Sequence, residues 1–366
     1  MSQLATDLPK RQKLVLGILL MTLGCLPLLG CGSKSPGSVT QEKSEEGAGR
    51  LGENDSETIS QVSGQSRDVR LTYEVEIEAV PQGQTAKIWV PRIHDDPYQS
   101  VEIVSVEIPG ELRSDKEEKY GNEYWYTEAQ PDAEGKILLK VIYDVRRQEV
   151  TPLNYVAVTP EETETFLQEN ELVPIGGEPL EAMLRGQQIP TEAGQKARSY
   201  YDLVLNHVDY KKPEGEPWGR GDTNWVCESQ FGNCTDFHSL FISLCRSTQV
   251  PARFEMGFPL GTDSQSTIGG YHCWAYFNAE DRWHPVDISE ADKNEALREY
   301  YFGRLTPDRI AVTQGRDIQL KPLPAAGPLN YFVNPWVEVG DQPHSQTVRR
   351  YRYEPVPEKA TDASRD

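Results

Sequence analysis

Basic residues and long apolar runs are both scarce in this sequence of 366 residues. Lys and Arg number 37 against 57 Asp and Glu, which gives a formal net charge of −20. Because phosphate binding needs clustered Lys and Arg, this balance argues against nucleic acid as a partner. The low mean hydropathy excludes a protein with several membrane-spanning helices. A hydrophobic fraction of only 37% also indicates that part of the chain stays unpacked.

Paired metal-ligand motifs are missing as well. The six cysteines include no C-x₂-C pair, and the histidines include no H-x₃-H pair, so the usual zinc spacings are absent. No acidic loop has the ligand spacing of a calcium site. We therefore expect neither a metal nor another cofactor, and we interpret Asp281, Glu290 and Asp292 as ordinary surface charges.

A basic segment precedes a short apolar run at the start of the chain. Three basic residues come before the uncharged run 14–30, which ends in Leu-Leu-Gly and is followed by Cys31. This order is typical of an export signal. Leu-Leu-Gly-Cys resembles the lipobox of bacterial lipoproteins, in which cleavage precedes the cysteine and the cysteine carries the lipid. The resemblance implies lipid attachment at Cys31 and a membrane anchor in the bacterial cell envelope. An ordinary signal peptide or a single N-terminal anchor remains the alternative.

The composition changes after this run. Residues 31–66 are rich in Ser, Gly and Glu and contain few large apolar side chains. Such a segment buries too little apolar surface to offset its chain entropy, so we expect a disordered tether.

The first folded block has the pattern of β-strands. Leu71, Tyr73, Val75 and Ile77 alternate with polar residues, and this period of two indicates a half-buried strand. Turn residues separate several similar runs, and no helical period competes with them. The spacing predicts a small antiparallel β-sandwich without a cluster of catalytic side chains. The further strands are expected at 86–90, 101–108, 123–127 and 136–145.

Two longer helices are predicted after the sandwich and its connector. Four prolines interrupt residues 148–189, where we expect a connector with one or two short helices. Thr191 is the expected N-cap of a helix that ends near His207. The second helix is expected over residues 234–246, because apolar residues recur there at i, i+3, i+4, i+7 and i+8.

Cys234 stands at the expected start of this second helix. Gly232 and Asn233 indicate a tight entry, and the helix dipole and unpaired N–H groups at such a terminus favour a thiolate. Cys234 is therefore a candidate nucleophile. A structural or capping cysteine is the alternative that this segment alone leaves open.

Two strands further along the chain supply a histidine and an aspartate. Residues 271–277 and 283–288 are expected to be strands joined by a polar turn. A four-residue loop at 278–281 would place His272 directly opposite Asp287, with Cβ atoms about 5 Å apart. Because Pro285 cannot donate to a ladder, the second strand must lie at a sheet edge or be irregular. A thiol, an imidazole and a carboxylate together form a nucleophile, its base and the group that orients the base.

These blocks resemble the transglutaminase-like superfamily. The resemblance rests on Gly-Asn-Cys234-Thr-Asp-Phe-His, Val-Pro-Ala-Arg253, His272-Cys-Trp-Ala-Tyr-Phe and Trp-His-Pro-Val-Asp287, in this order over roughly residues 190–320. It implies a papain-like α+β domain whose Cys-bearing helix packs on an antiparallel sheet. It also implies Cys234 as nucleophile, His272 as base and Asp287 as orienter. The stretches 315–318 and 330–332 are expected to be further strands of this domain.

The expected fold class is thus α+β, with a small all-β sandwich before the transglutaminase-like domain. The expected divisions are a signal peptide at 1–30, the tether at 31–66, the sandwich at 67–147, the connector at 148–189, the catalytic domain at 190–340, and a C-terminal strand and polar tail at 341–366.

Several residues compete for roles in this site. His238 lies one turn after Cys234 and is a rival base, although no orienting group is evident for it. His284 is expected to point away from His272. Trp225 and Gln230 are candidate side-chain donors to the oxyanion, alongside backbone N–H groups near Cys234.

The remaining thiols are expected to be structural. Cys245 fits the apolar stripe of the helix, which predicts a buried core thiol. Disulfides among Cys227, Cys245 and Cys273 are possible in an oxidising envelope compartment, and Cys25 would be removed with the signal peptide.

Three functions fit these residues. The first is a hydrolase that acts on protein or peptide amide bonds through a thioester acyl-enzyme. The second is an acyltransferase in which an amine resolves the same thioester and crosslinks proteins. The third is an envelope binding module that has lost the chemistry. We favour hydrolysis of a protein or peptide substrate. We also expect membrane contact through the N-terminal lipid and no nucleic-acid partner. The sequence does not indicate an oligomeric state.

Overall fold

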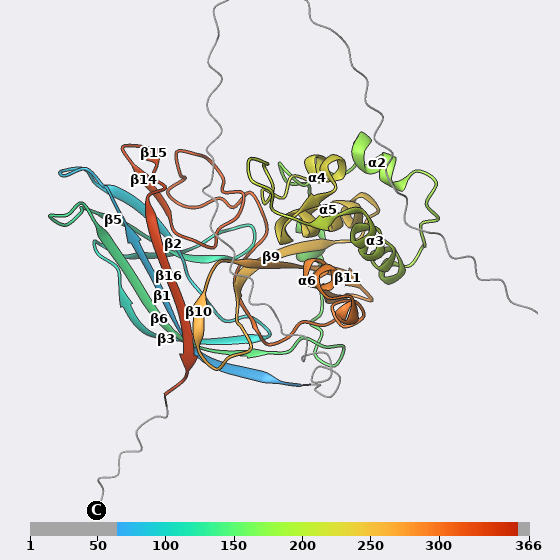
Figure 1. The fold of residues 1–366 in the computed structure, drawn as a ribbon, viewed down its shortest axis with the longest axis horizontal. Coiled ribbons are helices and arrows are strands. Elements are labelled where there is room, and N and C mark those ends of the chain that lie inside the picture. Colours follow the sequence, from blue (N-terminus) through green and yellow to red (C-terminus); the bar gives the residue numbers. More distant parts are fainter. Residues whose placement is uncertain (1–63, 358–366) are drawn as a thin grey trace, which may run out of the picture. The chain divides into compact units, whose positions relative to one another are not determined.

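The computed structural model describes residues 64–357 (Figure 1). The predicted signal peptide, Cys31 and most of the predicted tether lie outside the described residues. No helix between residues 64 and 357 is long and apolar enough to cross a membrane.

Two five-stranded antiparallel sheets form the β-sandwich, and Figure 1 shows their strands together, on the side away from helices α3 and α5. The strand order is β10-β16-β1-β6-β3 in one sheet and β15-β14-β2-β5-β4 in the other. The first sheet contains β1 (Ser66–Ile77), β3 (Gln99–Glu107), β6 (Ile137–Gln148), β10 (Ser266–Ile268) and β16 (Thr347–Pro355). The second contains β2 (Ala86–Pro91), β4 (Arg113–Lys116), β5 (Glu123–Ala129), β14 (Trp336–Val339) and β15 (Gln342–Pro343).

The alternating pattern of the first strand is confirmed. Leu71, Tyr73, Val75 and Ile77 are all at most 1% exposed. The intervening glutamates are half-buried, and Glu76 pairs with Lys136, just before β6, while Glu74 pairs with Arg350 on β16. Alternation therefore places one face of β1 in the core, as its sequence predicts.

Strands from distant parts of the chain complete the sandwich. Strand β16 pairs with β1, so that the rings of Tyr73 and Tyr351 stack with their centroids 4.7 Å apart. Strand β14 pairs with β2, and β10 adds to the outer edge of β16. The sandwich therefore extends beyond the expected 67–147, and residues 336–340 contribute to it although they were expected in the catalytic domain.

Helices begin in the connector. The connector contains α1 (Pro160–Thr165) and α2 (Glu178–Leu184), and α3 (Ala193–His207) follows it. Helix α3 ends where predicted, but the expectation of Thr191 as its N-cap is wrong. The N-cap is Glu192, whose side chain makes no capping hydrogen bond.

A four-stranded antiparallel sheet and the helix that carries Cys234 form the centre of the remaining fold. Helix α5 packs on strands β11 and β9, and all its residues from Cys234 to Arg246 are buried. The sheet order is β12-β11-β9-β13. These strands are β9 (Ala252–Pro259), β11 (His272–Ala279), β12 (Arg282–Val286) and β13 (Arg309–Gln314). Around them lie β7 (Asp209–Tyr210), α4 (Thr223–Ser229), β8 (Phe231–Gly232), α5 (Cys234–Ser247), α6 (Ile288–Lys293) and the 3₁₀ helix η2 (Glu295–Leu297).

The fold class is confirmed: an all-β sandwich accompanies an α+β unit in which a helix carrying the cysteine packs on an antiparallel sheet. The strands expected at 315–318 and 330–332 are wrong. The chain leaves β13 at Gln314, Asp317 adopts a positive φ of 56°, and only an isolated bridge joins Ile318 to Leu329.

Candidate active site

Cys234 is the first residue of helix α5, as predicted. The Asn233 side chain accepts a hydrogen bond from the backbone N–H of Thr235, over 2.9 Å. In return the Asp236 carboxylate accepts one from the backbone N–H of Asn233, also over 2.9 Å. This reciprocal capping box fixes the point at which the helix begins, and so places the Cys234 thiol at the positive end of the helix dipole.

Asp236 also holds a second segment against the start of the helix. Its carboxylate accepts hydrogen bonds from the backbone N–H groups of Gly219 (2.7 Å) and Gly221 (2.9 Å). Burial raises the pKa of Asp236 to about 6, although these hydrogen bonds favour the ionised form. A Cβ atom on Gly232 would lie 2.4 Å from the Asp236 Oδ2 atom, so only glycine fits at the entry to the helix.

His272 and Asp287 form a direct hydrogen bond. The distance from His272 Nε2 to Asp287 Oδ2 is 2.7 Å, and both side chains are buried. Because a carboxylate only accepts, Nε2 must carry the proton. In the neutral ring Nδ1 then holds the lone pair, so this nitrogen is the one that can act as a base.

The predicted register of the hairpin is wrong. Glu280 and Asp281 form a two-residue turn with φ values of 53° and 55°, and strand pairing continues to Ala279 opposite Arg282. Two consecutive positive φ values are the mark of a type I′ turn. Every partner therefore shifts by two residues, which preserves the face on which each side chain lies.

His272 and Asp287 meet for a different reason from cross-strand pairing. Strand β12 ends at Val286, and Asp287 becomes the N-cap of α6, where its Oδ1 accepts from the backbone N–H of Glu290 over 3.2 Å. The same side chain thus starts a helix with one oxygen and binds the imidazole with the other. As Pro285 required, β12 is an edge strand.

Arg309, from strand β13, is a second partner of Asp287 that the sequence analysis missed. Its Nη2 and Nε atoms donate to Asp287 Oδ2 over 2.6 and 3.0 Å. Burial alone would raise the pKa of Asp287, but the charges of His272 and Arg309 outweigh it and hold that pKa well below its usual range. Asp287 is therefore a permanent carboxylate.

His238 is a structural residue. Its Nε2 accepts the backbone N–H of Ile288 over 3.0 Å, so Nδ1 carries the proton and donates to the backbone oxygen of Cys234 over 2.7 Å. Burial lowers the pKa of His238 to about 4. With both nitrogens engaged and the ring neutral, His238 is a poor candidate for the base.

His238 also shows how the site is connected. It bonds to the backbone of Cys234, and its Nε2 lies 3.9 Å from Asp287 Oδ1, while the other oxygen of Asp287 binds His272. One cluster therefore connects His272 and Asp287, through His238, to the backbone at the first turn of α5, where Cys234 lies. Cys234 and Asp287 are 0% exposed and His272 is 5% exposed, so this is a closed site.

The other predicted residues make local contacts of their own. His284 stacks on Phe277 and binds the Ala279 carbonyl, as expected for a structural residue. Trp225 packs on Phe231, whereas Gln230 is an exposed C-cap in the left-handed region. Neither placement identifies an oxyanion donor.

The four described cysteines are reduced, so the disulfides considered among Cys227, Cys245 and Cys273 are not formed. Cys245 is a core thiol, as predicted. Burial raises the pKa of Cys227 to about 12, which makes it a poor nucleophile.

Glu290 and Asp292 are more than surface charges, contrary to the sequence-based interpretation. Glu290 binds the ammonium of Lys293, and Asp292 accepts the backbone N–H of Tyr210. Asp281 is exposed in the hairpin turn. Among residues 64–357, no three His, Cys, Asp or Glu side chains are grouped so that they could hold a metal ion.

Residues 181–288 match the model of the Transglutaminase-like superfamily. This confirms the resemblance and covers Cys234, His272 and Asp287. The chain therefore carries a transglutaminase-like domain over this range.

Similar proteins were found in three bacterial species. An uncharacterized protein of Haemophilus influenzae is 25% identical over 340 residues, covering 79% of this chain and 90% of that protein. A chain from Cytophaga hutchinsonii, provisionally named a cysteine protease, shares 14% identity with a TM-score of 0.49, covering 80% of this chain and all of that one. The periplasmic domain of TgpA from Pseudomonas aeruginosa shares 15% identity with a TM-score of 0.32, covering 63% of this chain and 90% of that domain.

Proposed function

We propose that this protein is a cysteine enzyme that hydrolyses amide bonds in proteins or peptides through a thioester acyl-enzyme. Cys234 is the nucleophile, His272 the general base and Asp287 the residue that orients the imidazole. The observation that carries the proposal is the His272–Asp287 hydrogen bond of 2.7 Å, in one cluster with a cysteine at a helix N-terminus.

The proposed reaction has two halves. His272 Nδ1 takes the thiol proton, and the thiolate attacks the substrate carbonyl carbon. The amide bond then breaks, the imidazolium gives its proton to the leaving amine, and a thioester remains on Cys234. In the second half His272 takes a proton from water, the hydroxide attacks the thioester, and the acid product leaves the regenerated thiol.

The surroundings of the triad support this assignment. The positive end of α5 favours both the thiolate and the oxyanion that forms beside it. Asp287 stabilises the imidazolium, and Arg309 keeps Asp287 ionised. Because Cys234 is 0% exposed, a substrate has to displace side chains that cover the thiol before it reacts.

The same burial favours a second candidate, acyl transfer to an amine. A site that excludes water protects the thioester from hydrolysis, so that an amine such as a lysine resolves it instead. The two reactions separate in one assay, in which a glutamine-containing peptide is incubated with a labelled amine. Label in the peptide favours transfer, whereas released ammonia or a cut peptide without label favours hydrolysis.

The assignment itself is tested by labelling with a thiol-directed acyl-enzyme probe. Wild type and Cys227→Ala should be labelled on Cys234, and Cys234→Ala should not. Undiminished labelling of folded Cys234→Ala would refute the assignment. A protein that binds envelope peptides without being labelled is the inactive module.

We further propose that Cys31 carries a lipid that anchors the protein in the bacterial cell envelope. Several acyl chains would hold it firmly, whereas one would be marginal. Metabolic incorporation of a labelled fatty acid should depend on Cys31 and disappear in Cys31→Ala.

A further inference from the structure

Glu290 in the first turn of α6 and Lys293 at the end of this helix form an ion pair close to Tyr210. The Lys293 ammonium is 2.7 Å from Glu290 Oε1 and lies 4.0 Å from the centre of the Tyr210 ring. In the short parallel pair of β7 and β8, Tyr210 is the partner of Gly232, two residues before Cys234. The Tyr210 ring also lies 6.2 Å from the ring of Phe237 on α5. Tyr210 thus holds the lysine next to the first turn of the helix.

The charge of Lys293 acts on this site. Burial would lower the pKa of Lys293, but the charge of Glu290, followed by those of Cys234 and Asp287, raises it instead. Lys293 therefore stays an ammonium throughout the range in which a thiol titrates. Its side chain is only 25% exposed, so water screens the charge less than it would at the surface.

We propose that Lys293 is a positioning residue that stabilises the thiolate of Cys234 by its charge, and that Glu290 opposes this effect. The two residues carry opposite charges and pair with each other, so removing each one should move the reactivity of the Cys234 thiol in opposite directions. The inference rests on the proposed role of Cys234 as nucleophile, and it adds two residues that set how reactive the nucleophile is.

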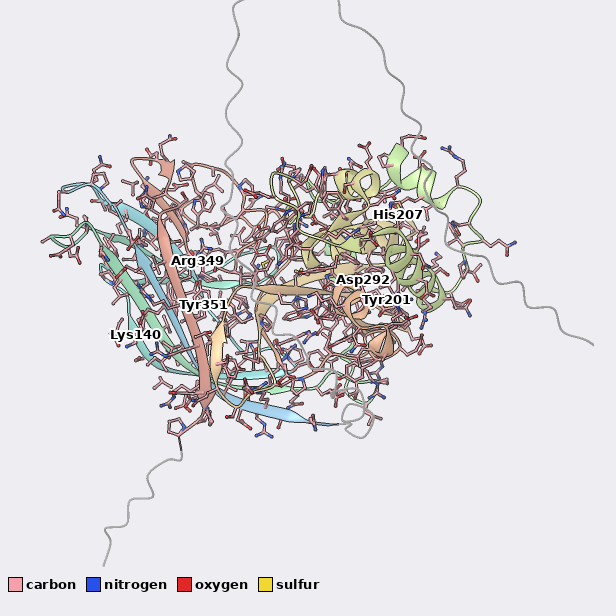
Figure 2. The ribbon with its side chains drawn as sticks, viewed as in Figure 1. Lys140, Tyr201, His207, Asp292, Arg349 and Tyr351 are labelled. Atoms are coloured by element: carbon pink, nitrogen blue, oxygen red, sulfur yellow. The ribbon has the colours of Figure 1, made fainter. Side chains whose placement is uncertain are left out.

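Other charges face the same region and have to be held constant. The Lys212 ammonium lies 5.7 Å from the centre of the Tyr210 ring. Asp292, labelled in Figure 2, accepts the Tyr210 backbone N–H over 3.1 Å. The cluster described above adds His272, neutral His238, Asp287 and Arg309. Asp209 on β7 and Lys211 just after it form a further ion pair.

The test measures alkylation of Cys234 by iodoacetamide between pH 4 and 10, with the adduct mapped by mass spectrometry. Iodoacetamide is uncharged, so Lys293 does not attract the reagent itself. Lys293→Met should lower the rate at pH 6 about tenfold and shift the profile to higher pH. Glu290→Gln should raise the rate about threefold and shift the profile to lower pH, because it leaves Lys293 unopposed.

The control variants separate charge from structure. Lys293→Arg keeps the charge and should retain the wild-type profile within about threefold. Lys293→Gln replaces Lys293→Met if the latter does not fold, as judged by circular dichroism. Two outcomes would overturn the inference: equal profiles for wild type and both neutral variants, or shifts of both variants in the same direction.

The same experiment distinguishes this inference from the proposed function. If wild-type Cys234 reacts as a thiolate at pH 6 and Lys293→Met reacts equally fast, only the charge effect of Lys293 is refuted. If wild-type Cys234 shows no thiolate reactivity below the range of an ordinary thiol, near pH ~8.5, the nucleophile assignment itself fails.

Discussion

The carboxylate of Asp287 is the group whose removal should affect the site most. Asp287→Asn removes one negative charge but leaves a side chain that can still cap α6, because Asn is as good an N-cap as Asp. The variant should therefore keep the backbone of the hairpin and helix while losing the charge beside the imidazole.

The size of the effect follows from the distances. His272 Nε2 lies 2.7 Å from Asp287 Oδ2, which places the centre of the imidazolium charge about 4 Å away. Opposite charges at that distance attract by about 4 kcal/mol at an effective dielectric constant of 20. Arg309 would also remain as an uncompensated cation within reach of the ring. We expect the thiolate–imidazolium pair to become about a hundredfold to a thousandfold less populated at pH 6.

Alkylation of Cys234 by iodoacetamide as a function of pH measures this directly. Wild type should show thiolate reactivity well below the range of an ordinary thiol, and Asp287→Asn should lose it. Asp281→Asn is the matched control, because it makes the same substitution at an exposed turn residue whose positive φ Asn tolerates. Coincident profiles for wild type and folded Asp287→Asn would refute the reasoning.

Three further predictions concern stability. The pKa of Asp236 is raised to about 6 in the folded protein, against 3.8 for an ordinary Asp. This group therefore stabilises the fold below pH ~4, and its contribution of up to about 3 kcal/mol is lost as pH rises through ~6. Urea unfolding of Asp236→Asn between pH 4 and 7 should show a smaller pH dependence of the unfolding free energy than wild type. His238→Ala should lower the free energy of unfolding in urea by about 3 kcal/mol, because it leaves the Cys234 carbonyl and the Ile288 N–H without their partner. The pH profile of Cys234 alkylation should keep its midpoint, since His238 is neutral above pH ~5. Truncation after residue 346 should abolish cooperative thermal unfolding because it removes β16, whereas truncation after residue 357 keeps every described strand and should preserve the melting temperature.

The local signals in the sequence predicted local structure well. Gly232 and Asn233 indicated where α5 begins, and the capping box explains why Cys234 lies at its first turn. The spacing from Asn233 to Asp236 is itself that of a capping box, so Asp236 could have been recognised as a functional neighbour of Cys234. The alternation in β1 likewise predicted which of its side chains enter the core.

The hairpin register failed for a specific reason. The usual signals of a two-residue turn are Asn-Gly and Asp-Gly, whereas Glu280 and Asp281 adopt the same positive φ values without a glycine. The sequence therefore favours a longer loop. His272 and Asp287 still meet, because the shift of two residues keeps His272 on its face and Asp287 reaches the imidazole as the N-cap of α6.

Contacts formed by pairing of distant strands had no local signal. Arg309 reaches Asp287 because β13 pairs with β9, and nothing near Arg309 in the sequence indicates that pairing. The same holds for β14 and β16, which pair with β2 and β1 from the other end of the chain. The position of Lys293 beside Cys234 depends on how α6 packs on α5 and β7, which periodicity alone does not predict.

Detection of the acyl-enzyme tests the central claim most directly. Wild type, Cys227→Ala and Cys234→Ala would be mixed with p-nitrophenyl acetate, quenched in acid after a short time and digested for peptide mass spectrometry. The account predicts an acetyl thioester on Cys234 in the first two proteins and none in the third, which should also lose turnover. The account would be contradicted if folded Cys234→Ala hydrolysed the ester at the wild-type rate and carried the acetyl group on another residue.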